Sequence, residues 1–271
     1  MNPIDPILTV LIGMALVMSL AWLVQGGTRN GGWVDVFWTF GTGAACVTAA
    51  LWPGQAVDQA RQFLVAALAA VWSLRLGSYI AHRVSKDAHE DRRYAGLRVE
   101  WGGAFQRNMY FLCIVQAPAT ALLSLSVFSA SHGGAEGLGL RDALGAAMLA
   151  IGIVGEGVAD EQMRRFRRTA ERGSIMDKGL WGWSRHPNYF FEWVTWLAYP
   201  VIAFDPNVAW SWATLVAPVM MFLLLRFGTG VPALEKTMLA SRVDRFRDYQ
   251  KRVSAFFPWP PRPSSSRSVS A

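Results

Sequence analysis

The chain is poor in cysteine, histidine and charged residues. Its 271 residues include 2 Cys and 4 His, and charged residues make up 17%. Both cysteines, Cys46 and Cys113, lie within apolar runs, which excludes a disulfide-stapled scaffold and a cysteine-rich metal centre. The chain also lacks GxGxxG and GxxxxGK[ST] motifs, since Gly41-Thr-Gly43 has no third glycine, so no Rossmann or P-loop site is predicted.

Hydrophobic residues make up 52% of the chain, and its 13 Trp and 15 Phe exclude a disordered polypeptide. A membrane-spanning helix needs about 20 mostly apolar residues. Seven runs meet this requirement: 6–25, 32–52, 63–82, 109–128, 143–160, 188–204 and 208–227. The first run has no preceding Lys or Arg, unlike a signal peptide, so we expect it to be retained. The sequence therefore predicts an all-α integral membrane protein with about seven transmembrane helices.

Basic residues are distributed very unequally over the two sides of this topology. The loops on the side of the C-terminus carry 22 Lys and Arg, against 2 on the side of the N-terminus. The positive-inside rule then predicts an N-terminus outside and a C-terminus in the cytoplasm. Because topology accounts for most of the net charge of +7, we expect no nucleic-acid partner. We expect one membrane domain over 1–259 and, from its Pro/Ser-rich composition, a disordered tail over 260–271.

Several ionisable residues lie in or next to the apolar runs, where they are costly unless they face a cavity. Glu156, Asp160, Arg164 and Arg167 follow one helical stripe at spacings of 4, 4 and 3. One interpretation is a set of ion pairs on a solvated helix end. The other is a cavity wall, acidic at depth and basic at its cytoplasmic mouth, which would suit a phosphate-bearing cofactor.

Two further patterns allow both structural and functional interpretations. Trp72, Arg75 and Tyr79 share one face of the third run, either as an aromatic belt around a snorkelling cation or as the wall of a pocket for an anion or carbonyl. The segment 89–94, His-Glu-Asp-Arg-Arg-Tyr, alternates in charge and suggests an ordered loop or a helix cap.

The densest motif is GLWGWSRHPNYFFEW at 179–193. Pro187 suits the first turn of a helix, with Ser184 or His186 as its cap. Asn188 and Glu192 then share a face, and the helix N-terminus beside Arg185 predicts an anion site. No second His lies at ligand spacing from His186, so no metal site is predicted.

This motif resembles the C-terminal signature of the steroid 5-alpha-reductase superfamily, and the whole chain is most similar to a branch of bacterial membrane proteins. The resemblance covers roughly 30–260 and includes Asp35-Val-Phe-Trp38, Trp72-Ser-Leu-Arg75 and Glu90-Asp-Arg-Arg-Tyr94. It implies a seven-helix fold in a bacterial inner membrane, with NADPH bound in a cavity that faces the cytoplasm.

The resemblance also assigns roles by position. It implies that ten residues contact the cofactor: Arg75, Tyr79, Glu156, Asp160, Arg164, Arg167, Arg185, Asn188, Glu192 and Tyr249. Steroid reductases polarise the substrate ketone with a Glu on the second span and a Tyr on the third. Here the nearest acid is Asp35 and Trp72 stands at the Tyr position, which makes these two the candidate catalytic residues.

We therefore expect an NADPH-dependent reduction of a C=C bond conjugated to a carbonyl in a steroid-like or other lipidic substrate. Asp35 is the proton donor if burial keeps it protonated, and otherwise a structural partner of Arg75. The alternative is an S-adenosylmethionine-dependent methyltransferase of the isoprenylcysteine carboxyl methyltransferase type, whose pattern Glu235, Tyr249 and Phe257-Pro258 echo. A third alternative is a lipid-binding protein that has kept the fold without activity. The seven spans and the basic mouth favour NADPH.

Overall fold

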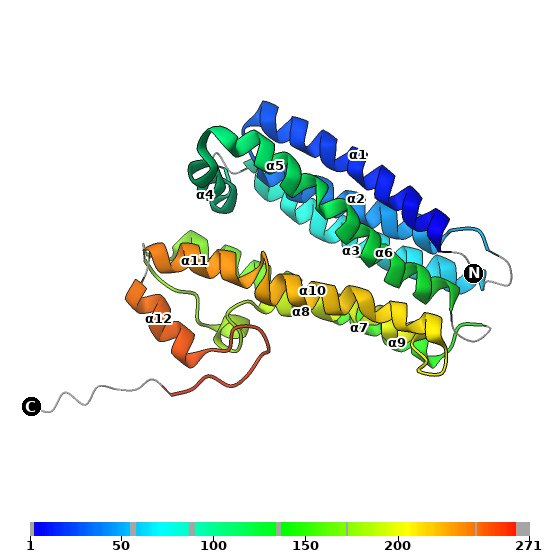
Figure 1. Ribbon diagram of the computed structural model, residues 1–271. Helices are drawn as coiled ribbons and strands as arrows, with labels where there is room; N and C mark the ends of the chain where they lie inside the picture. Colours follow the sequence, from blue (N-terminus) through cyan, green and yellow to red (C-terminus); the bar gives the residue numbers. More distant parts are fainter. Residues whose placement is uncertain are drawn as a thin grey trace, which may run out of the picture. The chain divides into compact units, whose positions relative to one another are not determined.

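The computed structural model describes residues 3–54, 58–86, 90–133, 137–171, 173–241 and 243–263. Over these residues the chain forms helices and no strand (Figure 1). His89, at the start of the charged segment 89–94, lies outside the described residues. The expected all-α architecture is confirmed.

The chain divides into two compact units, each described by itself below. The first comprises Met1–Leu149 and Trp196–Met220, and the second comprises Ala150–Thr195 and Met221–Ala271. The single domain expected over 1–259 stays a prediction.

In the first unit, α2 lies at the centre of a helix bundle and packs against α1, α3 and α6 (Figure 1). The complete helices of this unit are α1 Ile4–Thr28, α2 Gly32–Ala50, α3 Gln59–Lys86, α4 Arg92–Trp101, α5 Phe105–Ile114, α6 Gln116–His132 and α9 Ala198–Ala203, with the 3-10 turns η1 Gly102–Ala104 and η3 Ala209–Leu215. A Cβ at Gly43 would lie 2.0 Å from Ser73 Oγ, so α2 and α3 approach closely there. Thr42 and Thr120 share a hydrogen bond of 2.9 Å between α2 and α6. Small residues and hydroxyl bonds of this kind join helices where lipid offers no hydrophobic driving force between them.

The second unit is built around the C-terminal part of α7 and most of α8. Its elements are η2 Gly179–Gly182, α11 Val231–Ser241 and α12 Val243–Arg252, together with parts of α7 Leu140–Thr169, α8 Pro187–Trp196 and α10 Val216–Phe227. Gly155 lets the Phe191 ring pack directly on α7, because a Cβ there would lie 2.3 Å from that ring. Phe246, Tyr249 and Val253 form a small core under α12.

Five of the seven expected spans fall in helical segments that are long and apolar enough to cross a membrane. These segments are Ile4–Thr28, Gln59–Lys86, Arg93–His132, Leu140–Thr169 and Ala209–Ala240. The run 32–52 forms α2, which carries Asp35 and several Gly and Thr residues among its apolar ones. The run 188–204 is divided between α8 and α9, so neither helix alone is long enough. Five spans are thus confirmed, and the other two stay predictions.

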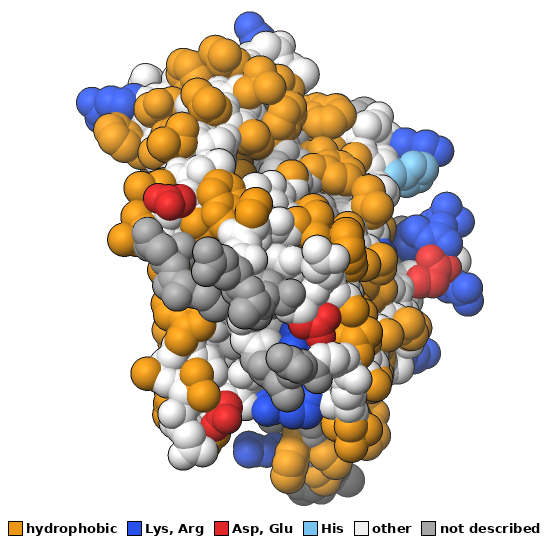
Figure 2. Space-filling model, turned by 90° about the vertical axis from the view of Figure 1, so that its right-hand side faces the viewer, with side chains coloured by type: hydrophobic (Ala, Val, Ile, Leu, Met, Phe, Trp, Pro, Cys, Tyr) orange, Lys and Arg blue, Asp and Glu red, His pale blue; other side chains and the backbone are white. Residues whose placement is uncertain are grey.

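Helix α1 shows how the chain meets lipid. One of its faces is buried and contains Val10, Met14 and Met18. The opposite stripe leaves large apolar side chains 49–69% exposed: Leu8, Ile12, Leu16, Leu20 and Leu23. Hydrophobic side chains also cover much of the face seen in Figure 2, with charged side chains in separate patches between them and along the edges. A surface of this kind belongs in a bilayer, and the protein is an integral membrane protein.

Candidate functional site

The twelve site residues expected from the sequence fall into two groups. The first unit holds four of them: Asp35, Trp72, Arg75 and Tyr79. The second unit holds the other eight: Glu156, Asp160, Arg164, Arg167, Arg185, Asn188, Glu192 and Tyr249.

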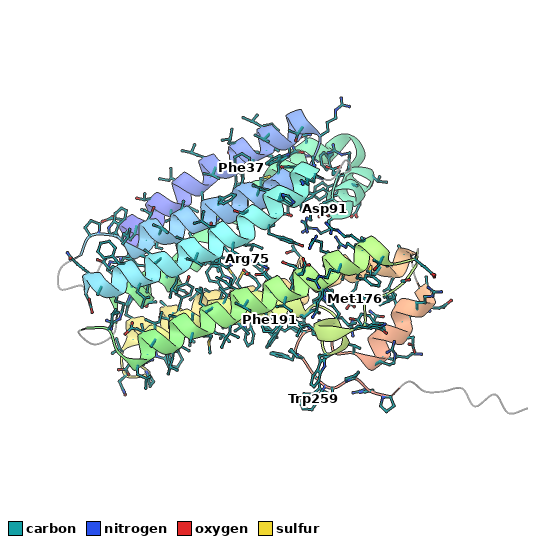
Figure 3. All side chains as sticks on the ribbon, turned by 180° about the vertical axis from the view of Figure 1, so that it is seen from behind. Phe37, Arg75, Asp91, Met176, Phe191 and Trp259 are labelled. Carbon is teal, nitrogen blue, oxygen red and sulfur yellow. The ribbon has the colours of Figure 1, made fainter. Side chains whose placement is uncertain are left out.

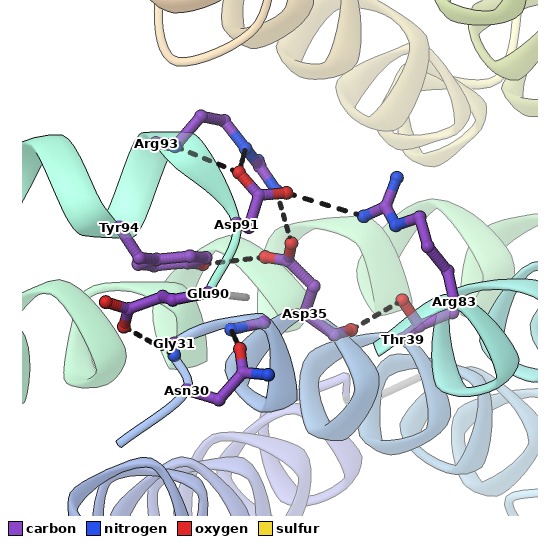
Figure 4. Close-up of polar contacts among 10 residues, drawn as sticks. Asn30, Gly31, Asp35, Thr39, Arg83, Glu90, Asp91, Arg93 and Tyr94 are labelled. Carbon is purple, nitrogen blue, oxygen red and sulfur yellow. Dashed lines mark hydrogen bonds and ion pairs between the residues drawn. The ribbon is translucent and has the colours of Figure 1, made fainter. Parts of the chain in front are cut away.

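Asp35, on the first turn of α2, is a hydrogen-bond acceptor (Figure 4). Its Oδ2 lies 2.6 Å from Nη2 of Arg93, and its Oδ1 accepts the hydroxyl of Tyr94 over 2.7 Å. Both partners lie on α4. Because both oxygens of the Asp35 carboxylate accept hydrogen bonds from α4, the structural interpretation of Asp35 is favoured over proton donation. Among the described residues, the Asp35 carboxylate forms hydrogen bonds with Arg93 and Tyr94. The partner expected from the sequence was Arg75.

The segment that precedes α4 is an ordered cap, as its charge pattern suggests. Asp91 Oδ1 accepts the backbone N–H of Arg93 over 3.0 Å and caps the helix. Burial disfavours the charged form of Asp91, but hydrogen bonds from Arg93 outweigh this and hold its pKa below the usual value. Glu90 accepts from the backbone of Gly31 at 2.9 Å and from Arg98 at 2.8 Å, which fastens this cap to the chain before α2. Sequence reasoning missed Arg93 and Tyr94 as partners of Asp35. Both lie nearly sixty residues further along the chain, and helical periodicity does not predict contacts at that separation.

Trp72, Arg75 and Tyr79 lie on α3 as expected. Trp72 is 1% exposed and packs edge-on against Trp196, with ring centroids 4.9 Å apart. The Arg75 guanidinium lies 5.7 Å from the centroid of the Tyr79 ring, within range of a cation–π contact. Trp72 is thus a core residue of the first unit, and Arg75 and Tyr79 form a pair one helical turn away.

The charged stripe on α7 is acidic where it is buried and basic where it is exposed. Glu156 and Asp160 are 5% and 7% exposed. Arg164 and Arg167, further along the helix, are both exposed. Arg164 Nη2 donates to Glu161 over 2.7 Å, so part of the ion-pair interpretation also holds. The order expected for a cavity wall with a basic mouth is therefore present along this one helix.

The motif at 179–193 forms η2, a short link and the start of α8. Helix α8 begins at Pro187, and Ser184 Oγ accepts the N–H of His186 over 3.1 Å just before it. Trp181 Nε1 donates to the carbonyl of Ala159 over 3.0 Å, which holds η2 beside the buried acids of α7. The expected helix start at Pro187 is confirmed.

Arg185 joins this motif to the C-terminal part of the chain. Its Nε donates to Glu235 Oε1 over 2.8 Å, and its Nη1 donates to the carbonyl of Val253 over 2.6 Å. Glu235 also accepts from Gln250 at 2.7 Å and lies 3.2 Å from His186 Nε2. The Nε and Nη1 groups of Arg185 therefore donate to acceptors within the second unit.

Tyr249 is likewise engaged internally. It is 3% exposed, and its hydroxyl donates to the carbonyl of Trp181 over 2.5 Å. Burial raises the pKa of this hydroxyl above its ordinary value, so Tyr249 stays protonated. Arg185 and Tyr249 were both expected to contact the cofactor. In the structure they connect the motif at 179–193 to α11 and α12.

His186 is 6% exposed and stacks on Tyr189 with ring centroids 5.6 Å apart. Burial lowers the pKa of its imidazole below the ordinary 6.5, an effect that the hydrogen bond with Glu235 partly offsets and the nearby charge of Arg226 reinforces. The imidazole is accordingly neutral near neutral pH.

The other expected residues of the second unit lie on α7 and α8. Asn188, in the first turn of α8, is half-buried. Glu192 lies one turn later on the same face and is 5% exposed. Together with the two buried acids and two exposed arginines of α7, they form a set of carboxylates, an amide and cations on helices in direct contact. Nowhere in the described ranges do three His, Cys, Asp or Glu side chains gather as a metal site.

These observations define the class as an all-α integral membrane protein. A family model described as a protein of unknown function, DUF1295, matches residues 21–253. The chain belongs to the DUF1295 family. No curated protein and no solved structure matches it.

Proposed function

We propose that the chain is an NADPH-dependent membrane reductase of the steroid 5-alpha-reductase superfamily. The substrate would be a lipidic molecule with a C=C bond conjugated to a carbonyl. The observation that carries the proposal is the order of charge along α7, with buried Glu156 and Asp160 followed by exposed Arg164 and Arg167. The resemblance of residues 179–193 to the superfamily signature supports it.

The side chains of the second unit fit the chemistry of this cofactor. Carboxylates accept hydrogen bonds from ribose hydroxyls and from the nicotinamide amide, as Glu156, Asp160 and Glu192 would. Asn188 carries its amide in the first turn of α8, at the positive end of the helix, where a phosphate is favoured. Arg167 would hold the 2′-phosphate that distinguishes NADPH from NADH.

Bound NADPH would supply a hydride to the β-carbon of the conjugated system. The protein would then orient the substrate, exclude water and deliver a proton to the α-carbon. The contacts of Asp35 favour a structural role for it, so the proposal rests on the cofactor-binding residues of the second unit. With the membrane orientation predicted by the basic loops, these residues would face the cytoplasm, the N-terminus would lie outside, and the membrane would be a bacterial inner membrane.

A second candidate is an S-adenosylmethionine-dependent methyltransferase of the isoprenylcysteine carboxyl methyltransferase type. Glu235 and Tyr249, which echo that pattern, both bond to the motif at 179–193. However, S-adenosylmethionine carries no phosphate that the exposed arginines at the end of α7 could bind.

Cofactor binding to the detergent-purified full chain distinguishes these candidates. NADPH, NADH and S-adenosylmethionine would be titrated separately while thermal unfolding is followed. A ligand at 100 times its Kd adds about 2.7 kcal/mol of stability. Stabilisation by NADPH supports the reductase, and stabilisation by S-adenosylmethionine alone overturns it in favour of the methyltransferase. If NADPH binds but no lipid enone is reduced, the protein is a lipid-binding member that has lost activity.

A further inference from the structure

Large aromatic side chains are exposed together in the second unit. Trp183, Phe227, Phe257 and Trp259 are 50%, 60%, 48% and 71% exposed. We name these four residues the aromatic shelf. Figure 3 shows Trp259 on the outer edge of the C-terminal segment.

The shelf belongs to the folded unit, since backbone bonds fix its segment in place. Trp259 N donates to the carbonyl of Trp183 over 2.9 Å, and Ser184 Oγ donates to that of Phe256 over 2.8 Å. Beyond the shelf, Arg262 N donates to the carbonyl of Arg252 over 2.9 Å. Of the tail expected over 260–271, residues 260–263 therefore include an ordered contact, and 264–271 lie outside the described residues.

The inner sides of the same segment are packed on other aromatic rings. The Phe257 ring lies 5.6 Å from Trp193 and 5.7 Å from Phe222, measured between centroids. Phe222 in turn lies 5.7 Å from Phe227 at the end of α10. Phe227 and Phe257 of the shelf are thus packed on aromatic rings of the same unit.

The aromatic shelf continues the exposed apolar side of α10, which indicates that lipid covers the shelf. Leu223, one turn before Phe227 on the same helix face, is 52% exposed within an apolar membrane span. Leu223 and Phe227 thus extend the exposed apolar side of α10 to the aromatic shelf. Arg226 lies beside Phe227, with its guanidinium 4.9 Å from the ring centroid, and such a cation snorkels toward lipid phosphates. Tryptophan is the residue enriched where acyl chains meet headgroups.

We propose that the aromatic shelf inserts into the boundary between headgroups and acyl chains, on the side of the bilayer where α10 ends. It would anchor the C-terminal segment, and the motif at 179–193 to which it is bonded, at a fixed depth. The inference does not depend on any cofactor or reaction.

Depth-dependent quenching of tryptophan fluorescence tests this proposal on the full chain. The protein would be reconstituted in phosphatidylcholine and phosphatidylglycerol vesicles that contain a lipid spin-labelled at the headgroup or near the acyl-chain end. The difference in emission between the parent and a Trp183→Phe/Trp259→Phe variant reports on these two residues alone. Both are exposed, so the variant is expected to fold.

We expect about twofold stronger quenching of this difference signal by the headgroup label than by the deep label, and protection from aqueous iodide. The matched control is Trp196→Phe, which removes a tryptophan that is 1% exposed, and its difference signal should respond weakly to every quencher. Full access to iodide in vesicles, with no quenching by either lipid label, would overturn the proposal. Shielding from iodide without lipid quenching would also overturn it, because a protein surface would then cover the shelf.

Discussion

Arg185 Nε lies 2.8 Å from Glu235 Oε1, and this one ion pair connects the start of α8 with α11. The two side chains are 11% and 12% exposed, so neither is well solvated. Gln250 and His186 share the same carboxylate, at 2.7 and 3.2 Å. The position of the α8 N-terminus therefore depends on a residue fifty positions away.

Replacing Glu235 with Ala should destabilise the protein strongly. The change leaves Arg185 as a poorly solvated cation without its carboxylate, and breaking such a pair costs about 3 kcal/mol. Thermal unfolding in detergent measures the loss. Glu171→Ala, at an exposed position, is the control and should change the unfolding temperature little. Equal unfolding temperatures for the two variants would contradict the assigned role.

Replacing Arg167 with Ala should weaken NADPH binding about tenfold, or about 1.4 kcal/mol, and leave NADH binding almost unchanged. The reason is that only NADPH offers a 2′-phosphate to the guanidinium. Titration followed by thermal shift measures both affinities. Arg168→Ala, one residue further and also exposed, is the matched control. The proposed role of Arg167 fails if both cofactors, or both variants, lose affinity equally.

The stability of the folded chain should rise as pH increases toward 6.5, in part because of His186. Its pKa is lowered in the folded state, so between the folded and unfolded pKa values the unfolded chain binds more protons. This contribution is complete above the unfolded pKa and is lost as pH falls through the folded pKa. Unfolding temperatures from about pH 5 to 8 measure it. His186→Asn should flatten this slope, whereas His82→Asn, at an exposed position, should preserve it.

Asp35→Asn should lower stability by about 2 kcal/mol while NADPH still binds. The amide cannot serve Arg93 as a charged acceptor, but the second unit keeps its side chains. Unfolding and cofactor titration on one preparation give both values. Tyr94→Phe removes only one hydrogen bond and should cost about 1 kcal/mol. If Asp35→Asn abolishes turnover with stability unchanged, Asp35 is catalytic after all.

Gly43→Ala should destabilise the first unit by about 1–3 kcal/mol, because the added methyl would overlap Ser73 and force α2 away from α3. Gly13→Ala in α1 meets nothing within 4 Å and should be neutral or slightly stabilising. Comparison of the two unfolding temperatures isolates packing from helix propensity. Similar values would mean that α2 and α3 are not as closely packed as described.

The local sequence was sufficient to predict which segments form helices and which residues share a face of each helix. Twenty apolar residues in a row can satisfy their backbone in lipid only as a helix, which is why five spans follow from hydropathy. Helical periodicity also places Glu156, Asp160, Arg164 and Arg167 along one stripe of α7, and Pro187 starts α8 because its fixed φ suits a first turn. Hydropathy does not detect the break between α8 and α9 within the run 188–204, so this span stays a prediction.

Partners far apart in the chain were decided by tertiary packing alone. Asp35 bonds to Arg93 and Tyr94, Arg185 to Glu235, and Trp259 to Trp183. Periodicity gives the face of a residue on its own helix but not the helix that comes to lie against it. That choice depends on how glycines and bulky rings fit together between neighbouring helices, and it determines which distant side chains form hydrogen bonds with one another.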